Sequence, residues 1–341
     1  MTNTSMLVTL NQWTNRTFVL PVAIFFPTHR CNSRCVSCDW WKANGEDELT
    51  LNEIAHLAAS LAAAGTRLVL FSGGEPLLRP DVFEAAAPFL SSGITLHLHT
   101  SGVLLERCAT DVARTFSRVI VSLDACDEQQ YRDIRGVGAL RSLERGVARL
   151  RTLRPDVGVS ARSTLHRLNF RQLPAIIEHA RAMSLDSISF LPADTNSGAF
   201  GRSRTSDAAS LLLSREEIAE FADVVEQTIA ERTEDFASGF VAESPDKLRR
   251  LPQYYAAAAG LAPFPTVACN APYMSVVVEA NGDVRPCFFH TSLGSIRRSS
   301  LADIISRELP AFREMLSVDR NPVCQRCVCS MRTTWRSAPW S

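Results

Sequence analysis

The chain has 341 residues, of which 46% are hydrophobic, and its 36 lysine and arginine residues equal its 36 aspartate and glutamate residues. Its zero net charge gives no overall field that would draw it to nucleic acid or anionic lipid. No stretch approaches the roughly 18 consecutive apolar residues of a membrane span, and the first residues lack a signal-peptide layout. We therefore expect a cytoplasmic globular protein that acts on a small molecule or a neutral partner.

Six short apolar runs with strand-like composition alternate with helical patterns between residues 20 and 191. They begin at Leu20, Arg67, Ile94, Arg118, Val157 and Ser187. A helix is predicted between the first two, because Thr50 and Glu53 have capping-box spacing and Gly65 suits the C-terminal stop. Strands that alternate with helices in this way predict βαβ units and a parallel sheet.

Several of these strands alternate apolar with polar residues, whereas strands covered on both faces are continuously apolar. His97 and His99 share one face of the third strand. Ser122 and Asp124 repeat the pattern in the fourth strand, and Arg162 does so in the fifth. We infer a curved sheet with a polar lumen: the fold is α/β, a partial (β/α)6 barrel with a small C-terminal domain that holds a β-hairpin and a helix.

The later part of the chain is divided by composition. Residues 192 to 213 are rich in Gly, Ser, Asp and Arg, which indicates a linker or a loop that gates the substrate. A surface helix follows, opened by the capping pair Ser214 and Glu217. We therefore expect an N-terminal extension, the barrel, a linker with a helix, and the C-terminal domain. Their bounds are 1–19, 20–200, 201–262 and 263–341.

Ten cysteines in a chain without a secretory signal favour metal binding or catalysis over disulfides. Cys31, Cys35 and Cys38 follow the first strand, at the sheet edge where α/β barrels carry their chemistry. Structural zinc usually takes four ligands, whereas an iron–sulfur cluster with three protein ligands keeps one iron open. Cys108 and Cys126 stand alone, and we expect them to be small buried residues.

The loop "CNSRCVSC" resembles the C-x3-C-x2-C signature of the radical S-adenosylmethionine (SAM) enzyme superfamily. Further segments resemble other motifs of that family in the same order: "SGGEP" at 72–76, "HTSG" at 99–102, and "VSLDA" with "IRG" within 121–136. The resemblance covers residues 20–191. It implies a 4Fe–4S cluster on Cys31, Cys35 and Cys38 whose open iron binds SAM.

The resemblance also implies the residues that contact SAM. They are Gly73, Gly74, Glu75, Pro76, Thr100, Ser122, Asp124 and Arg135. Glu75 is suited to an ammonium and Arg135 to a carboxylate, although Asp124 could instead cap the next helix and Ser122 could bond to backbone. The family commonly has a large residue before the third cysteine, against the adenine; this chain has Ser37, and Trp40 or Trp41 could substitute.

A second cysteine group resembles the auxiliary-cluster module of the SPASM/twitch enzymes, in its single-cluster twitch form. Cys269 and Cys287 flank an apolar run, an Asn-Gly-Asp turn and a return strand, which predicts a β-hairpin. With Cys324 and Cys327 they would hold a second 4Fe–4S cluster or, on spacing alone, a structural zinc ion. Cys329 is left over, either to exchange with Cys327 or to stay a free thiol.

The activity implied by the resemblance is reductive cleavage of SAM to a 5′-deoxyadenosyl radical, which removes a hydrogen atom from a substrate in the lumen. A reductant such as flavodoxin or ferredoxin would supply the electron, and the auxiliary cluster could accept one from the substrate. The candidate catalytic and substrate contacts are His97, His99, Arg162 and Asp194. The histidines could titrate near neutral pH, which would suit proton transfer after oxidation, although the sequence alone does not show that they do.

Three hypotheses about function differ in what they require of the sequence. A small molecule or cofactor precursor is preferred, because the first strand begins near residue 20 and leaves no room for a peptide-recognition domain before it. Modification of a ribosomally made peptide stays open, since a separate recognition protein could serve. The third alternative is a non-catalytic metal module that binds nucleic acid, and the balanced charge disfavours it.

Overall fold

The computed structural model describes residues 3–195, 197–201, 209–329 and 331. Nine strands among these residues form one open sheet in the order β6-β5-β4-β3-β2-β1-β7-β8-β9. The first six are β1 (Val22–Thr28), β2 (Leu68–Gly73), β3 (Thr95–Thr100), β4 (Arg118–Ser122), β5 (Gly158–Leu165) and β6 (Ser187–Pro192). All six are parallel, each paired with its neighbour in sequence, and the sheet does not close. The predicted partial barrel is therefore confirmed.

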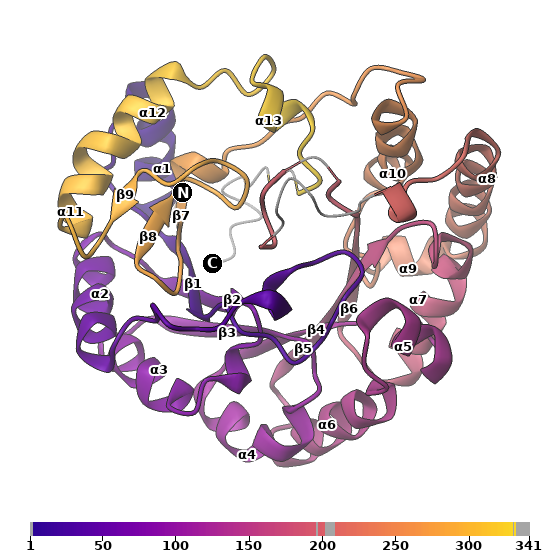
Figure 1. Ribbon diagram of the computed structural model, residues 1–341, viewed down its shortest axis with the longest axis horizontal. Helices are drawn as coiled ribbons and strands as arrows, with labels where there is room; N and C mark the ends of the chain where they lie inside the picture. The colour runs from indigo at the N-terminus through magenta and orange to yellow at the C-terminus, as the bar shows by residue number, and fades with distance from the viewer. Residues whose placement is uncertain (1–2, 196, 202–208, 330, 332–341) are drawn as a thin grey trace.

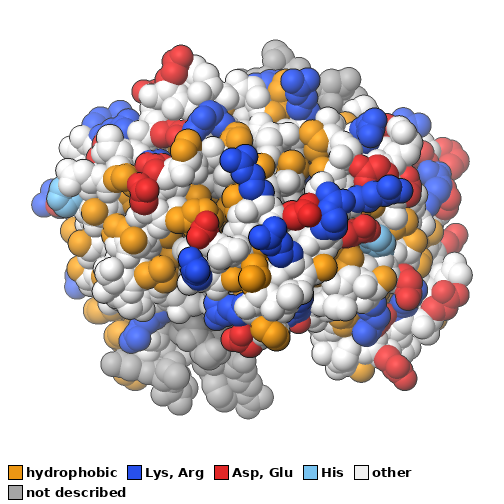
Figure 2. All heavy atoms as spheres, turned by 90° about the horizontal axis from the view of Figure 1, so that it is seen from below, with side chains coloured by type: hydrophobic (Ala, Val, Ile, Leu, Met, Phe, Trp, Pro, Cys, Tyr) orange, Lys and Arg blue, Asp and Glu red, His pale blue; other side chains and the backbone are white. Residues whose placement is uncertain are grey.

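Helices cover the convex face of the sheet, as Figure 1 shows. They are α2 (Leu51–Ala63), α3 (Val82–Ser91), α4 (Leu105–Thr115), α5 (Glu128–Arg135), α6 (Leu140–Leu153) and α7 (Leu173–Ala182). The predicted capping box of α2 is present, since the Thr50 hydroxyl accepts from the Glu53 amide and the Glu53 carboxylate from the Thr50 amide. Seen from the side of these outer helices, basic and acidic side chains are interspersed (Figure 2).

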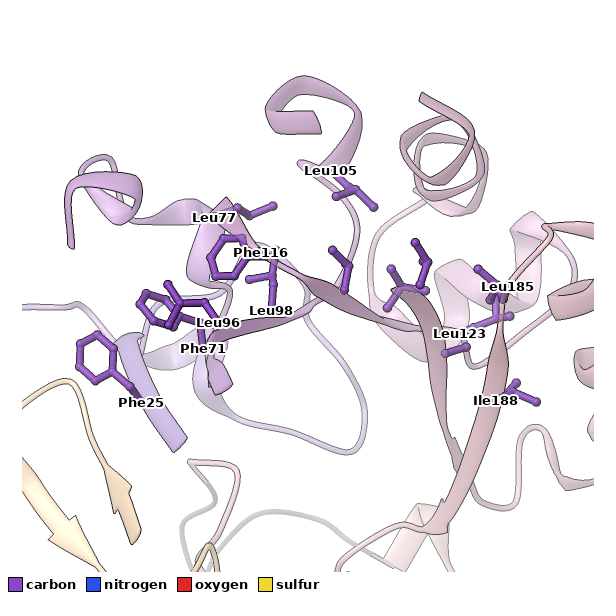
Figure 3. Close-up of a cluster of buried hydrophobic side chains, with 14 of the residues drawn as sticks. Phe25, Phe71, Leu77, Leu96, Leu98, Leu105, Phe116, Leu123, Leu185 and Ile188 are labelled. Carbon is purple, nitrogen blue, oxygen red and sulfur yellow. The ribbon is translucent and has the colours of Figure 1, made fainter. Parts of the chain in front are cut away.

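The core lies between this sheet and the helices. Leu96 and Leu98 of β3 are buried there, while His97 and His99 of the same strand point to the other face. Phe71 packs edge-on against Phe25, with ring centroids 5.4 Å apart, and the cluster continues along the strands (Figure 3). Each such buried side chain contributes roughly 1.5–3 kcal/mol. The apolar half of each alternating strand therefore fixes which polar residues face the lumen.

The C-terminal hairpin extends the barrel sheet. Its strands β7 (Ser275–Val278) and β8 (Asp283–Arg285) are antiparallel, as predicted, with Gly282 at a φ of 87° in the turn. No local pattern predicts that β7 pairs in parallel with β1, where Val22 lies opposite Ser275. The short β9 (Gly294–Ser295) completes the sheet. This pairing brings the second cysteine group to the rim of the barrel, while the proposed domain bounds stay a prediction.

The remaining helices close the molecule around this sheet. α8 (Arg215–Glu231) begins with the predicted capping box of Ser214 and Glu217. The others are α1 (Asn3–Thr14), α9 (Thr233–Ala237), α10 (Pro245–Ala258), α11 (Leu301–Asp303), α12 (Leu309–Met315) and α13 (Pro322–Gln325), with a π-helical turn at Ile304–Glu308. Residues 202–208 of the predicted gating loop lie outside the described residues. In the part of the chain that the structure describes, no helix has the length and apolarity to cross a membrane.

Candidate active site

The loop with the first three cysteines is fastened to α5 by backbone hydrogen bonds. The amides of Arg34 and Val36 donate to the carbonyls of Arg135, at 2.8 Å, and Ile134, at 3.0 Å. Gly136 ends α5 with a φ of 68°, and a Cβ there would lie 2.6 Å from the Arg34 carbonyl oxygen. The "IRG" segment therefore needs its glycine to let the cysteine loop approach the helix end.

The "GGEP" segment packs against the residues just before the cysteine loop. The amide of Gly74 donates to the Thr28 carbonyl at 3.1 Å, and the Glu75 amide donates to the Arg30 carbonyl at 2.8 Å. A Cβ on Gly74 would lie 2.1 Å from the Arg30 carbonyl oxygen, and Gly73 has a φ of 97°. Both glycines also line the lumen. Their small size thus serves first to seat the cysteine loop.

Glu75 does not reach the lumen wall as the sequence led us to expect. Its carboxylate is 0% exposed and accepts hydrogen bonds from the Leu77 amide at 3.0 Å and the Ser101 amide at 2.7 Å. The hydroxyls of Thr100, at 2.9 Å, and Ser101, at 2.6 Å, also donate to it. Pro76 begins the 3-10 turn that follows. The carboxylate therefore ties the loops after β2 and β3 together, and its contact with the SAM ammonium stays a prediction.

Asp124 and Arg135 form a buried ion pair beside the cysteine loop. Nη1 of Arg135 lies 2.9 Å from Oδ2 of Asp124, and the side chains are 11% and 4% exposed. The other Asp124 oxygen accepts from the Thr164 amide at 2.7 Å. Asp124 does not cap α5, because Asp127 does so. Nε of Arg135 is buried and has no hydrogen-bond partner among the described residues, so one donor of this guanidinium is available to a bound group.

One cavity at the carboxyl ends of the strands gathers most of the predicted site residues. It encloses about 1320 Å³ of empty space, including the part open to solvent. The predicted residues on its wall are Cys31, Cys35, Cys38, Gly73, Gly74, His99, Thr100, Ser122, Asp124, Arg135, Arg162 and Asp194. Ser37 and Trp40 line it as well, whereas Trp41 lies at the surface with 38% exposure. His97, Glu75 and Pro76 are not on its wall.

The two histidines of β3 differ from the expectation that they titrate near neutral pH. Burial, with the nearby Arg162 and Arg135 charges, lowers the pKa of His99 to about 3. Burial and Arg118 lower the pKa of His97 to about 4. His99 is therefore a neutral imidazole on the cavity wall at physiological pH, where it can donate or accept one hydrogen bond through each ring nitrogen.

Arg162 and Asp194 also line the cavity. Nε of Arg162 donates to the Ser189 hydroxyl at 3.2 Å, and Nη1 lies 4.0 Å from Sγ of Cys329. Asp194 is buried and accepts from the Ser197 amide at 3.2 Å and from the Ser197 hydroxyl. The fifth cysteine of the second group thus borders the same cavity as the first group.

The chemistry of the first cysteine group fits an iron–sulfur cluster. Burial raises the pKa of Cys31 to about 11 and also raises the pKa of Cys35 and Cys38. Thiolates in such surroundings require a cationic partner, which a metal cluster provides. Cys31 also accepts a hydrogen bond from the Ser33 amide at 3.5 Å. All three cysteines line the cavity, as does Arg135 with its available Nε.

The second cysteine group comes from segments far apart in the chain. Cys269 and Cys287 flank the hairpin, and Cys324 lies in α13, whose N-cap Asn321 accepts from the Cys324 amide at 3.3 Å. The amide of Asn270 donates to the Met331 carbonyl at 2.9 Å, which joins the two segments. The hairpin and the C-terminal segment are thus held together beside the barrel rim.

Electrostatic contacts connect the thiols of this group. Burial raises the pKa of Cys287 to about 11 and of Cys324 to about 12, and neighbouring cysteines raise both further. Nε2 of His290 lies 3.3 Å from Sγ of Cys324. In the part of the chain described here, no three His, Cys, Asp or Glu side chains are placed to hold a single metal ion. The assignment of metal ligands therefore rests on cysteine spacing and on the comparisons below.

Sequence reasoning missed the aromatic side of the cavity. Phe200, Phe288 and Phe289 line it, and we name these residues the aromatic trio. The ring centroid of Phe200 lies 6.2 Å from the ring centroid of Phe288 and 6.1 Å from that of Phe289. Phe200 follows β6 in a segment that composition marked only as a loop, while "FF" directly follows Cys287. Three rings from two distant segments meet only because the hairpin joins the barrel sheet.

Two family models match this arrangement of cysteines. The radical SAM superfamily model matches residues 25–180, and the model of an iron–sulfur cluster-binding domain, SPASM, matches residues 269–328. The chain thus contains a radical SAM domain followed by a SPASM domain. Its first cysteine group lies in the first match, and all of the second group except Cys329 lies in the second. These domains imply a 4Fe–4S cluster with SAM and an auxiliary iron–sulfur cluster.

Curated relatives resemble the barrel half of the chain. Fe-coproporphyrin III synthase of Methanosarcina barkeri is 32% identical over 179 residues, which cover 50% of this chain and 43% of that protein. A probable GTP 3′,8-cyclase of Methanococcus maripaludis is 33% identical over 178 residues, which cover 48% of this chain and 57% of that protein. The chain thus matches about half the length of these relatives.

A solved structure resembles nearly the whole fold. SuiB of Streptococcus suis, bound to SAM, gives a TM-score of 0.66 with 13% sequence identity and covers 96% of this chain and 76% of SuiB. At that identity the likeness concerns the fold alone. It agrees with the partial barrel and the C-terminal module seen here.

Proposed function

We propose that this chain is a radical SAM oxidoreductase that removes a hydrogen atom from a small molecule or cofactor precursor. The observation that carries the proposal is the single cavity lined by the three loop cysteines, by the motif residues after β2 to β4, and by Cys329 of the second group. A ligand in this cavity can contact both halves of the chain.

The cofactors would supply one-electron cleavage of SAM to a 5′-deoxyadenosyl radical, with the electron delivered by a reductant such as flavodoxin or ferredoxin. Cys31, Cys35 and Cys38 would hold the first cluster, and Cys269, Cys287, Cys324 and Cys327 the auxiliary one. The residues of this chain supply orientation and a shielded space. Arg135 offers its unpartnered Nε to an anionic group, while Asp124 neutralises the guanidinium from the other side.

The walls of the cavity support the exclusion of water around the reacting atoms. Trp40 stacks on His29, with centroids 4.5 Å apart, and borders the cavity beside the cysteine loop. Leu70 and Ile120 form apolar wall at its floor. The neutral His99 adds a hydrogen-bonding group without adding charge, so it can orient a substrate, while its lowered pKa makes it a weak proton acceptor near neutral pH.

A ribosomally made peptide is the alternative substrate. It is favoured by one observation: SuiB, which shares this fold, has also been solved bound to the precursor peptide SuiA. The sequence relatives bear names that indicate small substrates, a porphyrin and a nucleotide. We prefer a small molecule because those relatives share 32% and 33% identity, against 14% for SuiB in that complex.

The proposal is tested with anaerobically reconstituted protein, SAM and dithionite. We expect 5′-deoxyadenosine to form in the wild type and to fall to background in the Cys31→Ala/Cys35→Ala/Cys38→Ala variant. Cys108→Ala is the matched control, since Cys108 lies on the outer helix α4. Equal product in the triple variant and the wild type would contradict the assignment of the loop.

A further inference from the structure

We propose that the substrate joins an acidic group, a carboxylate or a phosphate, to an aromatic ring. Arg162 would bind the acid and the aromatic trio the ring. This inference rests on the proposed function and names the class of substrate that the same cavity takes.

Arg162 presents a cation that no described carboxylate contacts directly. It forms no ion pair within 4 Å in the part of the chain that the structure describes, although its charge acts on Glu243 from a greater distance. It contacts the Ser189 hydroxyl at 3.2 Å and Sγ of Cys329 at 4.0 Å. Of the two aspartates on the cavity wall, Asp124 pairs with Arg135, and Asp194 accepts from Ser197. A half-buried guanidinium fork of this kind is suited to a bidentate anion.

Arg162 and Arg135 serve different parts of the cavity. Arg135 lies beside the cysteine loop and is among the charges that lower the pKa of Cys31, Cys35 and Cys38. Both guanidinium charges act on His99 of β3, and that of Arg162 acts in addition on Glu243, whose carboxylate accepts from the Phe190 amide of β6. Arg162 thus faces the side next to Cys329 and the C-terminal module, where a substrate would lie beyond SAM.

Phe200 has an unusual backbone conformation, with a left-handed φ of 61° that is unfavourable for a non-glycine residue. The end of the cysteine loop holds it there, because the amide of Asp39 donates to the Phe200 carbonyl at 2.9 Å. Gly201 follows with a φ of 70°, and a Cβ there would lie 3.0 Å from the Trp40 amide nitrogen. These contacts keep the Phe200 ring on the cavity wall.

The trio then forms a corner for a flat apolar group. Phe200 and Phe288 are nearly parallel, at 23°, while Phe289 stands at 70° to Phe200. Such an arrangement offers both faces and edges to a bound ring. The trio and Arg162 line the same cavity as the cysteine loop, so a ligand held by both would lie beside the proposed SAM site.

The test is anaerobic calorimetric titration of the reconstituted protein with SAM present and no reductant. The probes are 2-naphthoate, 2-naphthyl phosphate, the neutral 2-naphthamide, and cyclohexanecarboxylate, which has the acid without the aromatic ring. We expect at least one acidic naphthyl probe to bind roughly tenfold or more tighter than the amide. Whichever of the two acids binds tighter identifies the acid as carboxylate or phosphate.

Variants assign the binding to residues. We expect Arg162→Gln to weaken binding of the acidic probe roughly tenfold to a hundredfold and to leave the affinity for the amide within about twofold of the wild type. Arg162→Lys should recover part of the lost affinity. Phe288→Leu should weaken binding of the naphthyl acid roughly two- to tenfold more than it weakens binding of cyclohexanecarboxylate. Retained amide binding shows that Arg162→Gln is folded. Arg149→Gln, on the exposed face of α6, is the control for the loss of one positive charge.

Several results would overturn the inference. Equal affinity for the acid and the amide, or no binding of any naphthyl probe, would do so. Weaker binding of SAM, with unchanged binding of the probe, in Arg162→Gln would also do so, because it would assign Arg162 to the SAM carboxylate. Deoxyadenosine formation by the wild type is measured separately. If it occurs without acid preference, this inference alone fails; if the acid preference holds but no deoxyadenosine forms, the proposed function fails and the ligand class stands.

Discussion

The two cysteine groups are built in opposite ways. The first lies within one loop of eight residues, "CNSRCVSC", whose backbone is fastened to α5 and to the "GGEP" segment. The second is gathered from the hairpin and from α13, and it forms only when those segments dock on the barrel. The first site is therefore set by local chain geometry and its neighbours, whereas the second depends on long-range packing.

Gly136→Ala should break the first site with the largest effect. The added Cβ meets the Arg34 carbonyl at 2.6 Å and must displace the cysteine loop or the end of α5. Gly93→Ala is the matched control, because Gly93 has a similar φ of 73° with nothing within 4 Å of its Cβ position. We expect Gly136→Ala to cost about 1–3 kcal/mol more than the control in chemical denaturation and to lose roughly four irons. Equal iron content in the two variants would refute the role given to Gly136.

Glu75→Gln should weaken the same region less completely. The amide places an NH2 group among four donors that now point at a carboxylate, so we expect a loss of roughly 1.5–3 kcal/mol in unfolding free energy. Deoxyadenosine formation should fall roughly tenfold or more because Thr100 and Ser101 shift on the cavity side. Glu84→Gln, on α3, is the control substitution. Wild-type stability in Glu75→Gln would contradict the hydrogen-bond network.

Cys324→Ser and Cys329→Ser sharpen the comparison within the second group. Cys324 is buried in α13 and lies inside the SPASM match, while Cys329 lies just outside it. We expect iron analysis to give roughly four irons for Cys324→Ser and roughly eight for Cys329→Ser. If both variants lose the same iron, Cys329 is a ligand too. If zinc is found in place of iron, the auxiliary site is a zinc site.

The smallest effect concerns pH. Because His99 and His97 have folded pKa values of about 3 and about 4, against 6.5 for an unperturbed histidine, the unfolded chain binds more protons between those limits. Their contribution to stability is therefore fully present above pH 6.5 and is lost as the pH falls. Each of the two histidines should lower the free energy of unfolding by about 1.4 kcal/mol at pH 5.5. Denaturation at pH 7.5 and 5.5 should show less pH dependence in His99→Gln than in the exposed-site control His56→Gln.

Much of the fold could be predicted because its signals are local. Strand alternation, the capping boxes at Thr50 and Ser214, and the Asn-Gly turn each depend on residues that are close in sequence. The pairing of β7 with β1 could not be predicted, since it joins residues about 250 positions apart and both strands are uniformly buried, with no polar face to set their place in the sheet. α10 was missed as well; its Pro252 interrupts the helical pattern, yet Tyr255 anchors it to the Leu165 carbonyl.

The site was predicted in outline but not in its connections. Residue types and order placed the cysteine loop, Ser122, Asp124 and Arg162 near one another, and the cavity brings them together. Which polar groups satisfy each other depends on side-chain rotamers, so the inward use of Glu75 could not be foreseen. His97 shares a strand face with His99 but lies closer to the amino end of β3, outside the cavity.

The most direct test of the central claim is anaerobic iron and sulfide quantification after reconstitution, with 5′-deoxyadenosine measured in parallel after dithionite reduction. The wild type should hold roughly eight irons and form deoxyadenosine, whereas the Cys31→Ala/Cys35→Ala/Cys38→Ala variant should hold roughly four and form none. A wild type that binds iron but yields no deoxyadenosine would contradict the assignment of this chain as a radical SAM oxidoreductase.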